Sequence, residues 1–362
     1  MGMTTALIYP PSSFADTEEL VAVGEAAAEY GGIYASHIRG EGKELVAAVE
    51  EALEVGERAG MPVEIFHYKA AYQPGWGTLI REAAERIEAA RARGVDVAAD
   101  QYPYTAGGTG LEATIPSWVF DGGPDSLRAR IARPEVRATL KEQVATGYPG
   151  WWNIVEASGG WENIVLVNAR NAENGRFEGM DLAAIGAEWG KDPADAAWDL
   201  VAQGDGRVMA IYHMMSEEDV KWAMQQPWVS IGSDAGAALN AGSADVLGLP
   251  HPRSYGTFPR VLARYVRDEG VLTLEEAVRK MTSWPATRMR LKGRGLLREG
   301  FWADVVVFDL DRVQDRATYE EPVLFPEGID IVLVNGVVVV EDGRHTQARP
   351  GHVLYGPGVT GR

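Results

Sequence analysis

The sequence predicts an α/β fold in which short buried strands alternate with amphipathic helices. Four apolar runs and three helical patterns alternate up to Tyr102, which is the order expected of a parallel sheet or of a barrel. Two of the apolar runs end in a histidine, His37 and His67. After Gly293 the pattern changes to short β-branched segments with Asn-Gly and Asp-Gly turns, which predicts a small all-β part.

The first complete repeat of this alternation is a β-α-β unit. Its strands are Ile33–Ser36 and Val63–Phe66, and the helical pattern between them ends at Gly60. A crossover of this kind makes the two strands parallel neighbours, so His37 and His67 should lie at the same edge of the sheet. The carboxyl ends of parallel strands are where barrel and open-sheet enzymes build their active sites.

The other early elements are a first strand, two helices and a fourth strand, predicted over Met3–Tyr9, Thr17–Tyr30, Thr78–Arg93 and Val95–Tyr102. The alternation stops after Gly110, and the following hundred residues are rich in Trp and Gly. We interpret them as an insertion or lid over the site, the alternative being a long irregular connection. Strands Val208–His213 and Val229–Ser233 and a helix capped at Thr273 follow.

Composition narrows the classes of function. The net charge is −18, which argues against a nucleic-acid partner because phosphate binding depends on Lys and Arg. The sequence contains no apolar run of the roughly 20 residues that span a bilayer, and its start does not resemble a signal peptide, so a cytoplasmic enzyme is expected. There is no Cys, so any metal must be bound by His, Asp, Glu or a modified Lys.

Three candidate metal ligands follow strands: His37, His67 and Asp234, the last in the segment GSDAG. Two imidazoles and a carboxylate suit a divalent ion such as zinc and leave positions open for water. A metal-bound water suits amide hydrolysis, and an Asp beside it would carry the proton. Taken singly, the histidines could be hydrogen-bonded in loops and Asp234 could cap a turn.

Other residues near these strand ends are candidates for binding a substrate carboxylate. Lys69 lies two residues after His67, Arg253 follows the Asp234 strand, and Tyr102 ends the next strand. Each of them alone could equally be solvated or structural. The sequence contains no Walker A, Rossmann, GxSxG or HExxH motif.

Several motifs together resemble the N-acyl-D-amino-acid deacylases, or D-aminoacylases, of the metal-dependent amidohydrolase superfamily. They are SHIRGE (36–41), the HxK at 67–69, DQYPYTAGGTG (100–110), MMSEEDV (214–220), GSDAG (232–236), HPRSYGTFPRVL (251–262) and the terminal ADVVVFD and VLVNG segments. The resemblance runs over essentially the whole chain. It implies a partial (β/α)8 TIM-type barrel with an insertion subdomain and a small C-terminal β-sandwich portion.

The resemblance also implies zinc and the hydrolysis of N-acyl-D-amino acids to a carboxylate and a D-amino acid. One ion would be tightly held by His37 and His67, with a second, weaker position near the catalytic Asp234. Lys69, Tyr102 and Arg253 would bind the substrate carboxylate. The serines that the family has after YPYTA are Gly107-Gly108 here, so Thr109 is the nearest hydroxyl that could replace them.

On this basis we expect four parts: barrel strands 4 to 7 with their helices in residues 1–106, the lid in 107–207, the end of the barrel with its last strand in 208–290, and part of a β-sandwich in 291–355. The family's HxH motif and its bridging Cys or Glu are absent, so the chain resembles the C-terminal two-thirds of a deacylase. Two other hypotheses stay open: an amidohydrolase of cyclic amides or dipeptides, and a non-catalytic fragment or subunit. The oligomeric state is open as well.

Overall fold

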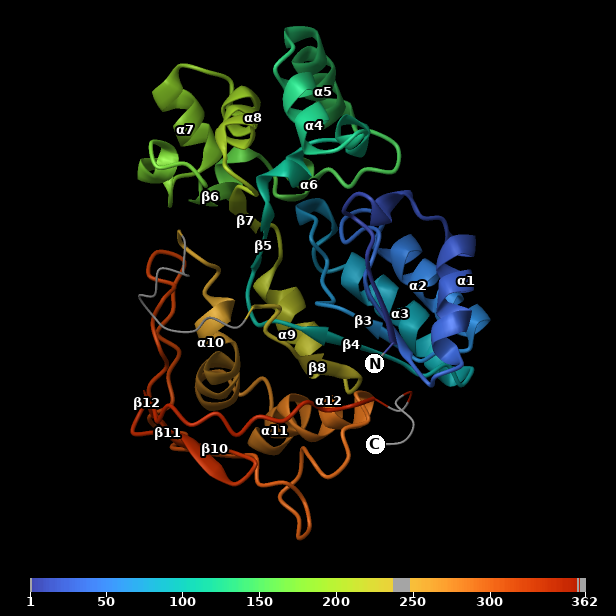
Figure 1. Ribbon diagram of the computed structural model, residues 1–362, viewed down its shortest axis with the longest axis vertical. Coiled ribbons are helices and arrows are strands. Elements are labelled where there is room, and N and C mark those ends of the chain that lie inside the picture. The colour runs from blue at the N-terminus through green and yellow to red at the C-terminus, as the bar shows by residue number, and fades with distance from the viewer. Residues whose placement is uncertain (1, 237–247, 357, 359–362) are drawn as a thin grey trace.

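The central element of the structure is a parallel sheet of five strands (Figure 1). The computed structural model describes residues 2–236, 248–356 and 358. The strands, in their order across the sheet, are β1 (Gly2–Ala6), β2 (Ile33–His37), β3 (Val63–Ile65), β4 (Val97–Gln101) and β8 (Val229–Ile231). All neighbouring strands are parallel, which confirms the predicted α/β class.

Three helices lie side by side next to the first strands: α1 (Thr17–Ala28), α2 (Leu45–Ala59) and α3 (Leu79–Ala92). Helix α2 shows why the sequence folds this way, because apolar residues three or four apart form its buried face, among them Leu45, Val49, Ala52 and Leu53. The helix ends at Gly60, whose φ of 69° is a left-handed conformation that glycine adopts without strain. The predicted β-α-β unit is thereby confirmed.

The insertion forms a subdomain around a hydrophobic core that also includes Ala71, Tyr102 and Tyr104. It contains the helices α4 (Pro124–Ile131), α5 (Pro134–Thr146), α6 (Ile154–Ala157), α7 (Leu182–Trp189) and α8 (Pro193–Gln203). Its antiparallel sheet has the order β5-β7-β6, with β5 (Ala106–Gly110), β6 (Ile164–Asn168) and β7 (Met209–His213). The fully buried Trp198 anchors the core.

Strand β7 lies beyond residue 207, where we expected the insertion to end. It pairs with β5 along one edge and with β6 along the other, so it belongs to the sheet of the insertion and not to the parallel sheet. A strand that is hydrogen-bonded along both edges has no edge left for the barrel. The antiparallel sheet therefore continues past the expected limit of the lid.

The chain returns to the parallel sheet through α9 (Glu217–Gln225) and β8. Further helices follow: α10 (Arg253–Arg260), a π-helix (Val261–Asp268), α11 (Leu274–Met281) and α12 (Ser283–Arg288). The side chain of Thr273 accepts a hydrogen bond from the backbone of Glu276, which confirms the predicted cap of α11. None of the helices in the described part of the chain is long and apolar enough to cross a bilayer.

The last part is an antiparallel sheet in the order β12-β11-β10-β9. Its strands are β9 (Val305–Phe308), β10 (Ile329–Val334), β11 (Val337–Glu341) and β12 (Arg344–His345). At the turn after β10, Asn335 and Gly336 have φ of 51° and 81°, as the Asn-Gly motif predicts. Since a sandwich needs two facing sheets, the residues described here form one layer of the predicted portion.

A buried arginine ties the late helices to the start of the parallel sheet. Arg288, at the end of α12, has a side chain that is 7% exposed. It donates to Glu64 Oε2 at 3.0 Å and to the carbonyl of Val63 at 2.8 Å, and it also pairs with Asp96. Burial raises the pKa of Glu64 to about 7, although the charge of Arg288 acts in the opposite direction.

We expect Arg288→Met to lower the free energy of unfolding at pH 8 by about 3 to 5 kcal/mol, because it leaves the Glu64 carboxylate buried without its partner. The second change Glu64→Gln should restore much of this loss. Urea unfolding followed by tryptophan fluorescence measures both effects.

The loss should be smaller at pH 5. The pKa of Glu64 is raised from 4.5 to about 7 in the folded protein, so at pH 5 Glu64 is mostly protonated and leaves no buried charge when Arg288 is removed. The stabilisation that comes from this raised pKa is fully present below pH 4.5 and is lost as the pH rises through 7. Arg312→Met, on an exposed arginine paired with Asp330, is the matched control and should change stability little. Equal losses for both arginines would contradict the role assigned to Arg288.

Candidate metal centre

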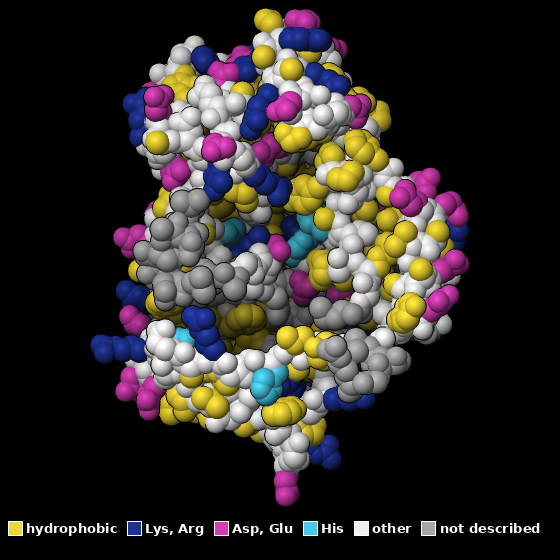
Figure 2. Space-filling model, in the orientation of Figure 1, with side chains coloured by type: hydrophobic (Ala, Val, Ile, Leu, Met, Phe, Trp, Pro, Cys, Tyr) yellow, Lys and Arg dark blue, Asp and Glu magenta, His cyan; other side chains and the backbone are white. Residues whose placement is uncertain are grey.

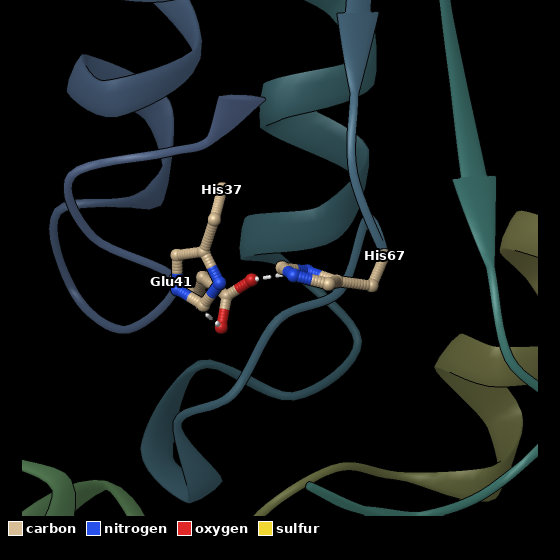
Figure 3. A group of neighbouring side chains, drawn as sticks. All are labelled: His37, Glu41 and His67. Carbon is tan, nitrogen blue, oxygen red and sulfur yellow. Dashed lines mark ion pairs between the residues drawn. The ribbon is translucent and has the colours of Figure 1, made fainter. Parts of the chain in front are cut away.

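Three side chains converge at the carboxyl end of the parallel sheet: His37, Glu41 and His67 (Figure 3). His37 is the last residue of β2, Glu41 lies in the loop that leads to α2, and His67 follows β3. One ligand atom from each residue lies within 4.8 Å of the ligand atoms of the other two. The rings of His37 and His67 meet edge to face, with centroids 4.4 Å apart.

His37 presents an unused nitrogen to this group. Its Nε2 atom is buried and has no hydrogen-bond partner, and it lies 3.7 Å from Glu41 Oε2. Burial lowers the pKa of His37 to about 3, even though the Glu41 carboxylate acts in the opposite direction. The imidazole is therefore neutral near pH 7 and keeps a lone pair that a metal ion can use.

Glu41 is a buried carboxylate surrounded by nitrogen atoms, with 2% of the residue exposed. Burial by itself raises its pKa, but the positive charge of Lys69 and the two imidazoles outweigh burial and hold the pKa below its ordinary value. Its Oε1 lies 2.9 Å from Nδ1 of His67 and also pairs with Lys69. Glu41 was not among the ligands that the sequence predicted.

The Lys69 ammonium lies inside this group. Its ammonium pairs with Glu41, donates to the carbonyl of His67 at 2.9 Å and lies 2.8 Å from Nδ1 of His67. A lysine has three N–H donors, and two of them have oxygen acceptors here, on Glu41 and on the His67 carbonyl. The structure thus gives Lys69 the role of orienting His67 and Glu41, and its predicted contact with a substrate carboxylate would require it to release one of them.

The backbone of His67 is held in an uncommon conformation. Its φ is 40°, and its N–H donates to Oδ1 of Asp100 at 2.8 Å. Asp100 lies in β4, and its own carbonyl accepts from the N–H of Tyr68 at 2.7 Å. A positive φ is uncommon for a residue other than glycine, and these two bonds hold His67 in this conformation.

All seven residues that the sequence predicted for the site line one cavity of about 570 Å³, which also contains Glu41. They are His37, His67, Lys69, Tyr102, Thr109, Asp234 and Arg253. Figure 2 shows the corresponding hollow near the middle of the molecule, where histidine, basic and acidic side chains gather. We call it the metal cavity.

Asp234 lies on the wall of the metal cavity but outside the His37–Glu41–His67 group. Its Oδ2 accepts from Nη1 of Arg253 at 2.8 Å, and its side chain is 39% exposed. Arg253 is also stacked over the ring of Tyr102, with its Cζ atom 4.6 Å from the centroid. The predicted roles of Asp234 as a ligand and as the catalytic carboxylate stay predictions.

Two further contacts complete the wall. The Thr109 hydroxyl lies 2.6 Å from the Tyr9 hydroxyl and accepts from Nη2 of Arg207 at 2.9 Å. The buried His251 bonds the carbonyl of Ala106 through Nε2 at 2.8 Å and accepts from the N–H of Arg253 through Nδ1 at 3.0 Å. His251 therefore fixes the start of α10, and with it Arg253, against the insertion sheet.

The donor set fits zinc. Two neutral imidazoles and one carboxylate are a known combination of zinc ligands, and they leave a position for water. The buried Nε2 of His37 without a hydrogen-bond partner is the feature that a metal ion would explain, since buried polar atoms normally have partners. A cation bound here would compete with the Lys69 ammonium for Glu41 and for His67.

Comparison with known proteins agrees with these features. The model of the Amidohydrolase family matches residues 183–340. A D-aminoacylase of Alcaligenes xylosoxydans xylosoxydans is 37% identical over 359 residues, which is 98% of this chain and 61% of that protein. An N-acyl-D-glutamate deacylase of the same organism is also 37% identical, over 98% of this chain and 60% of its own length.

One similar solved structure is that of an N-acyl-D-glutamate deacylase from Bordetella bronchiseptica, complexed with zinc and a phosphonate inhibitor that mimics the tetrahedral intermediate. It matches with a TM-score of 0.73 and 35% identity, over 94% of this chain and 61% of that one. A D-aminoacylase structure matches with a TM-score of 0.74 and 34% identity, over 96% and 61% of the two chains. This chain thus spans about three-fifths of the length of its relatives, and it belongs to the D-aminoacylase family of the amidohydrolase superfamily.

Proposed function

We propose that this protein hydrolyses the amide bond of N-acyl-D-amino acids with a zinc ion held by His37, His67 and Glu41. The observation that carries the proposal is the metal cavity, in which two imidazoles, the carboxylates of Glu41 and Asp234, and the cations Lys69 and Arg253 line one space. The relatives support the substrate class, because those named above are deacylases of N-acyl-D-amino acids.

The residues divide the chemistry between them. When bound, zinc supplies a Lewis acid that polarises a carbonyl and lowers the pKa of water. His37 and His67 would hold the ion through ring nitrogens, and Glu41 would hold it through a carboxylate oxygen. Asp234 has an exposed carboxylate on the same cavity wall, where it accepts the proton of the attacking water and passes it to the leaving amine.

Arg253 is the residue best placed to bind the substrate carboxylate. A guanidinium has five N–H donors, and the pair with Asp234 engages Nη1, so donors remain for a second carboxylate. Tyr102 lies beneath the guanidinium and is buried. Burial raises the pKa of Tyr102 above its ordinary value, so its hydroxyl keeps its proton and can donate to the same carboxylate.

The proposal is tested with the purified protein, loaded with zinc or treated with a chelator, and a panel of N-acetyl-D- and N-acetyl-L-amino acids. We expect zinc-dependent release of the D-amino acid and no release from the L-series. If the zinc-loaded protein released no D-amino acid from any member of the panel, the proposed function would be wrong.

Changing the three ligands should remove the metal. We expect His37→Ala, His67→Ala and Glu41→Gln each to weaken zinc binding by at least about 10- to 100-fold, the loss that removal of a supporting residue already causes. Competition with a chromophoric chelator measures the affinity. His345→Ala, on an exposed histidine in β12, is the control and should bind zinc like the parent. Unchanged affinity in Glu41→Gln would exclude Glu41 as a ligand.

Asp234→Asn separates proton transfer from metal binding. If Asp234 carries the proton, kcat should fall by about 10²- to 10⁴-fold, the usual contribution of a general base, while the zinc content stays at the parent level. Asp125→Asn, on a fully exposed carboxylate in α4, should leave kcat unchanged. Loss of zinc together with activity would instead make Asp234 a ligand.

The binding site for the substrate carboxylate is tested by removing the charge of Arg253 from the protein and, separately, the carboxylate from the substrate. We expect Arg253→Met to raise KM for an N-acyl-D-amino acid by about 10- to 100-fold, the worth of a hydrogen bond to a charged group. The corresponding N-acyl-D-amino-acid amide has no carboxylate, so its KM should be similar for the parent and the variant. An equal effect on both substrates would show that Arg253 acts on Asp234 and not on the substrate.

A further inference from the structure

A second and larger cavity lies beside the metal cavity. It has a volume of about 830 Å³, and apolar side chains form most of its wall, among them Leu7, Phe14, Ile115, Phe120, Leu127 and Trp151. Cavities of this size and character bury apolar ligands. None of the residues of the His37–Glu41–His67 group lines it, so it is not part of the site described above.

The two cavities adjoin. Ile8, Tyr9, Trp152, Ile154 and Arg207 line both of them. At this junction Tyr9 is fixed, because its hydroxyl lies 2.6 Å from that of Thr109 and the Cζ atom of Arg207 lies 4.9 Å from the centroid of its ring. The two cavities therefore meet at the ring of Tyr9.

The basic residues of the second cavity are largely engaged by the protein itself. Arg39 donates to both carboxylate oxygens of Glu51 at 2.8 and 2.9 Å, and Arg128 donates to the carbonyl of Gly204 at 3.3 Å. Glu112, Asp121 and Arg207 also line this cavity, and the remaining wall is chiefly hydrocarbon and aromatic surface. This chemistry favours an aliphatic chain over a charged group.

The arrangement of the metal cavity shows which part of a substrate points this way. The ring of His37 faces Tyr9, with centroids 5.6 Å apart, whereas the ring of His67 faces Tyr102, at 6.4 Å. Arg253 lies over Tyr102, with its Cζ atom 4.6 Å from the centroid of the ring. If the amide lies at the two histidines and its carboxylate at Arg253, the acyl group on the other side of the amide points toward Tyr9.

We propose that the second cavity is an acyl pocket, which binds the linear aliphatic chain of the acyl group of the substrate. The direction of the chain rests on the proposed function. The binding of an aliphatic carboxylate does not rest on the proposed function, because its chain enters the pocket whether or not the protein cleaves an amide. The substrate class is thereby narrowed to N-acyl-D-amino acids with medium or long acyl chains.

The test uses straight-chain carboxylates from acetate to decanoate, the acids that the proposed reaction would release. Their dissociation constants are measured by isothermal titration calorimetry on the zinc-loaded protein, below the concentrations at which the longer acids form micelles. We expect the dissociation constant to fall by about fourfold with each added methylene, the value expected when a CH₂ group leaves water for an apolar pocket.

Two substitutions reduce the volume of the pocket. Ala113→Phe and Ser117→Phe each place a ring on its wall and change no residue of the metal cavity. Both variants should bind acetate like the parent and should bind decanoate at least about tenfold more weakly than the parent, since they exclude two or more methylenes. Ala145→Phe adds the same ring at an exposed position on α5 that lines neither cavity, and it should keep the full dependence on chain length.

The inference would be overturned if the dissociation constant of the parent did not depend on chain length. It would also be overturned if both pocket variants kept the parent's thermal stability and its full dependence on chain length, or if Ala145→Phe weakened decanoate binding as much as they do. A steep dependence of the dissociation constant on chain length that both pocket variants weaken supports the acyl pocket, even in a protein that cleaves no amide. In that case only the proposed function fails, so the two failures can be told apart.

Discussion

The candidate site depends on one buried carboxylate. Glu41 is almost completely enclosed, and a buried charge of this kind is tolerated only where opposite charge and hydrogen bonds compensate for the lost water. Here the Lys69 ammonium and the imidazole of His67 contact one oxygen, and His37 faces the other. The contact of 2.9 Å that stabilises Glu41 also orients His67, so part of the arrangement that suits a zinc ion is a consequence of how this charge is buried.

The surroundings of the Glu41 carboxylate are assembled from several parts of the fold. Strand β2 positions His37 and β3 positions His67, and Asp100 of the next strand fixes the backbone of His67. Parallel strands make such a meeting possible, because their carboxyl ends lie at one edge. The metal group is therefore a product of the β-α-β connections, whereas the wall opposite depends on the insertion and on α10.

The histidines were predictable from the sequence, and Glu41 and Asp100 were not. His37 and His67 each follow an apolar run, and the period of the intervening helix fixes the two strands as parallel neighbours. The role of Glu41 depends on the path of a loop, which no periodicity specifies, although its position four residues after a strand-end histidine is a signal that a search for ligands could use. Asp100 lies inside a predicted strand, where its side chain gave no sign of bonding to a backbone.

The same distinction holds for the fold. Local turn chemistry predicted the Asn335-Gly336 hairpin because those two residues adopt the required conformation at no cost. Strand β7 was predicted as a strand, but its sequence does not state which edges it will meet. Its partners, β5 and β6, are distant from it in the sequence, and pairing between such distant segments is decided by the packing of the whole insertion core.

Reactivity and selectivity are consequently encoded in different stretches of this chain. The group around Glu41 comes from residues 37 to 69, within a single β-α-β unit. The residues that line the acyl pocket come mostly from the insertion and from the segment after β1. Changes in the insertion can alter the shape of that pocket without moving a metal ligand, because no ligand is anchored in it. Tyr9 and Thr109 are among the residues that lie between the two regions, and a hydrogen bond of 2.6 Å joins them.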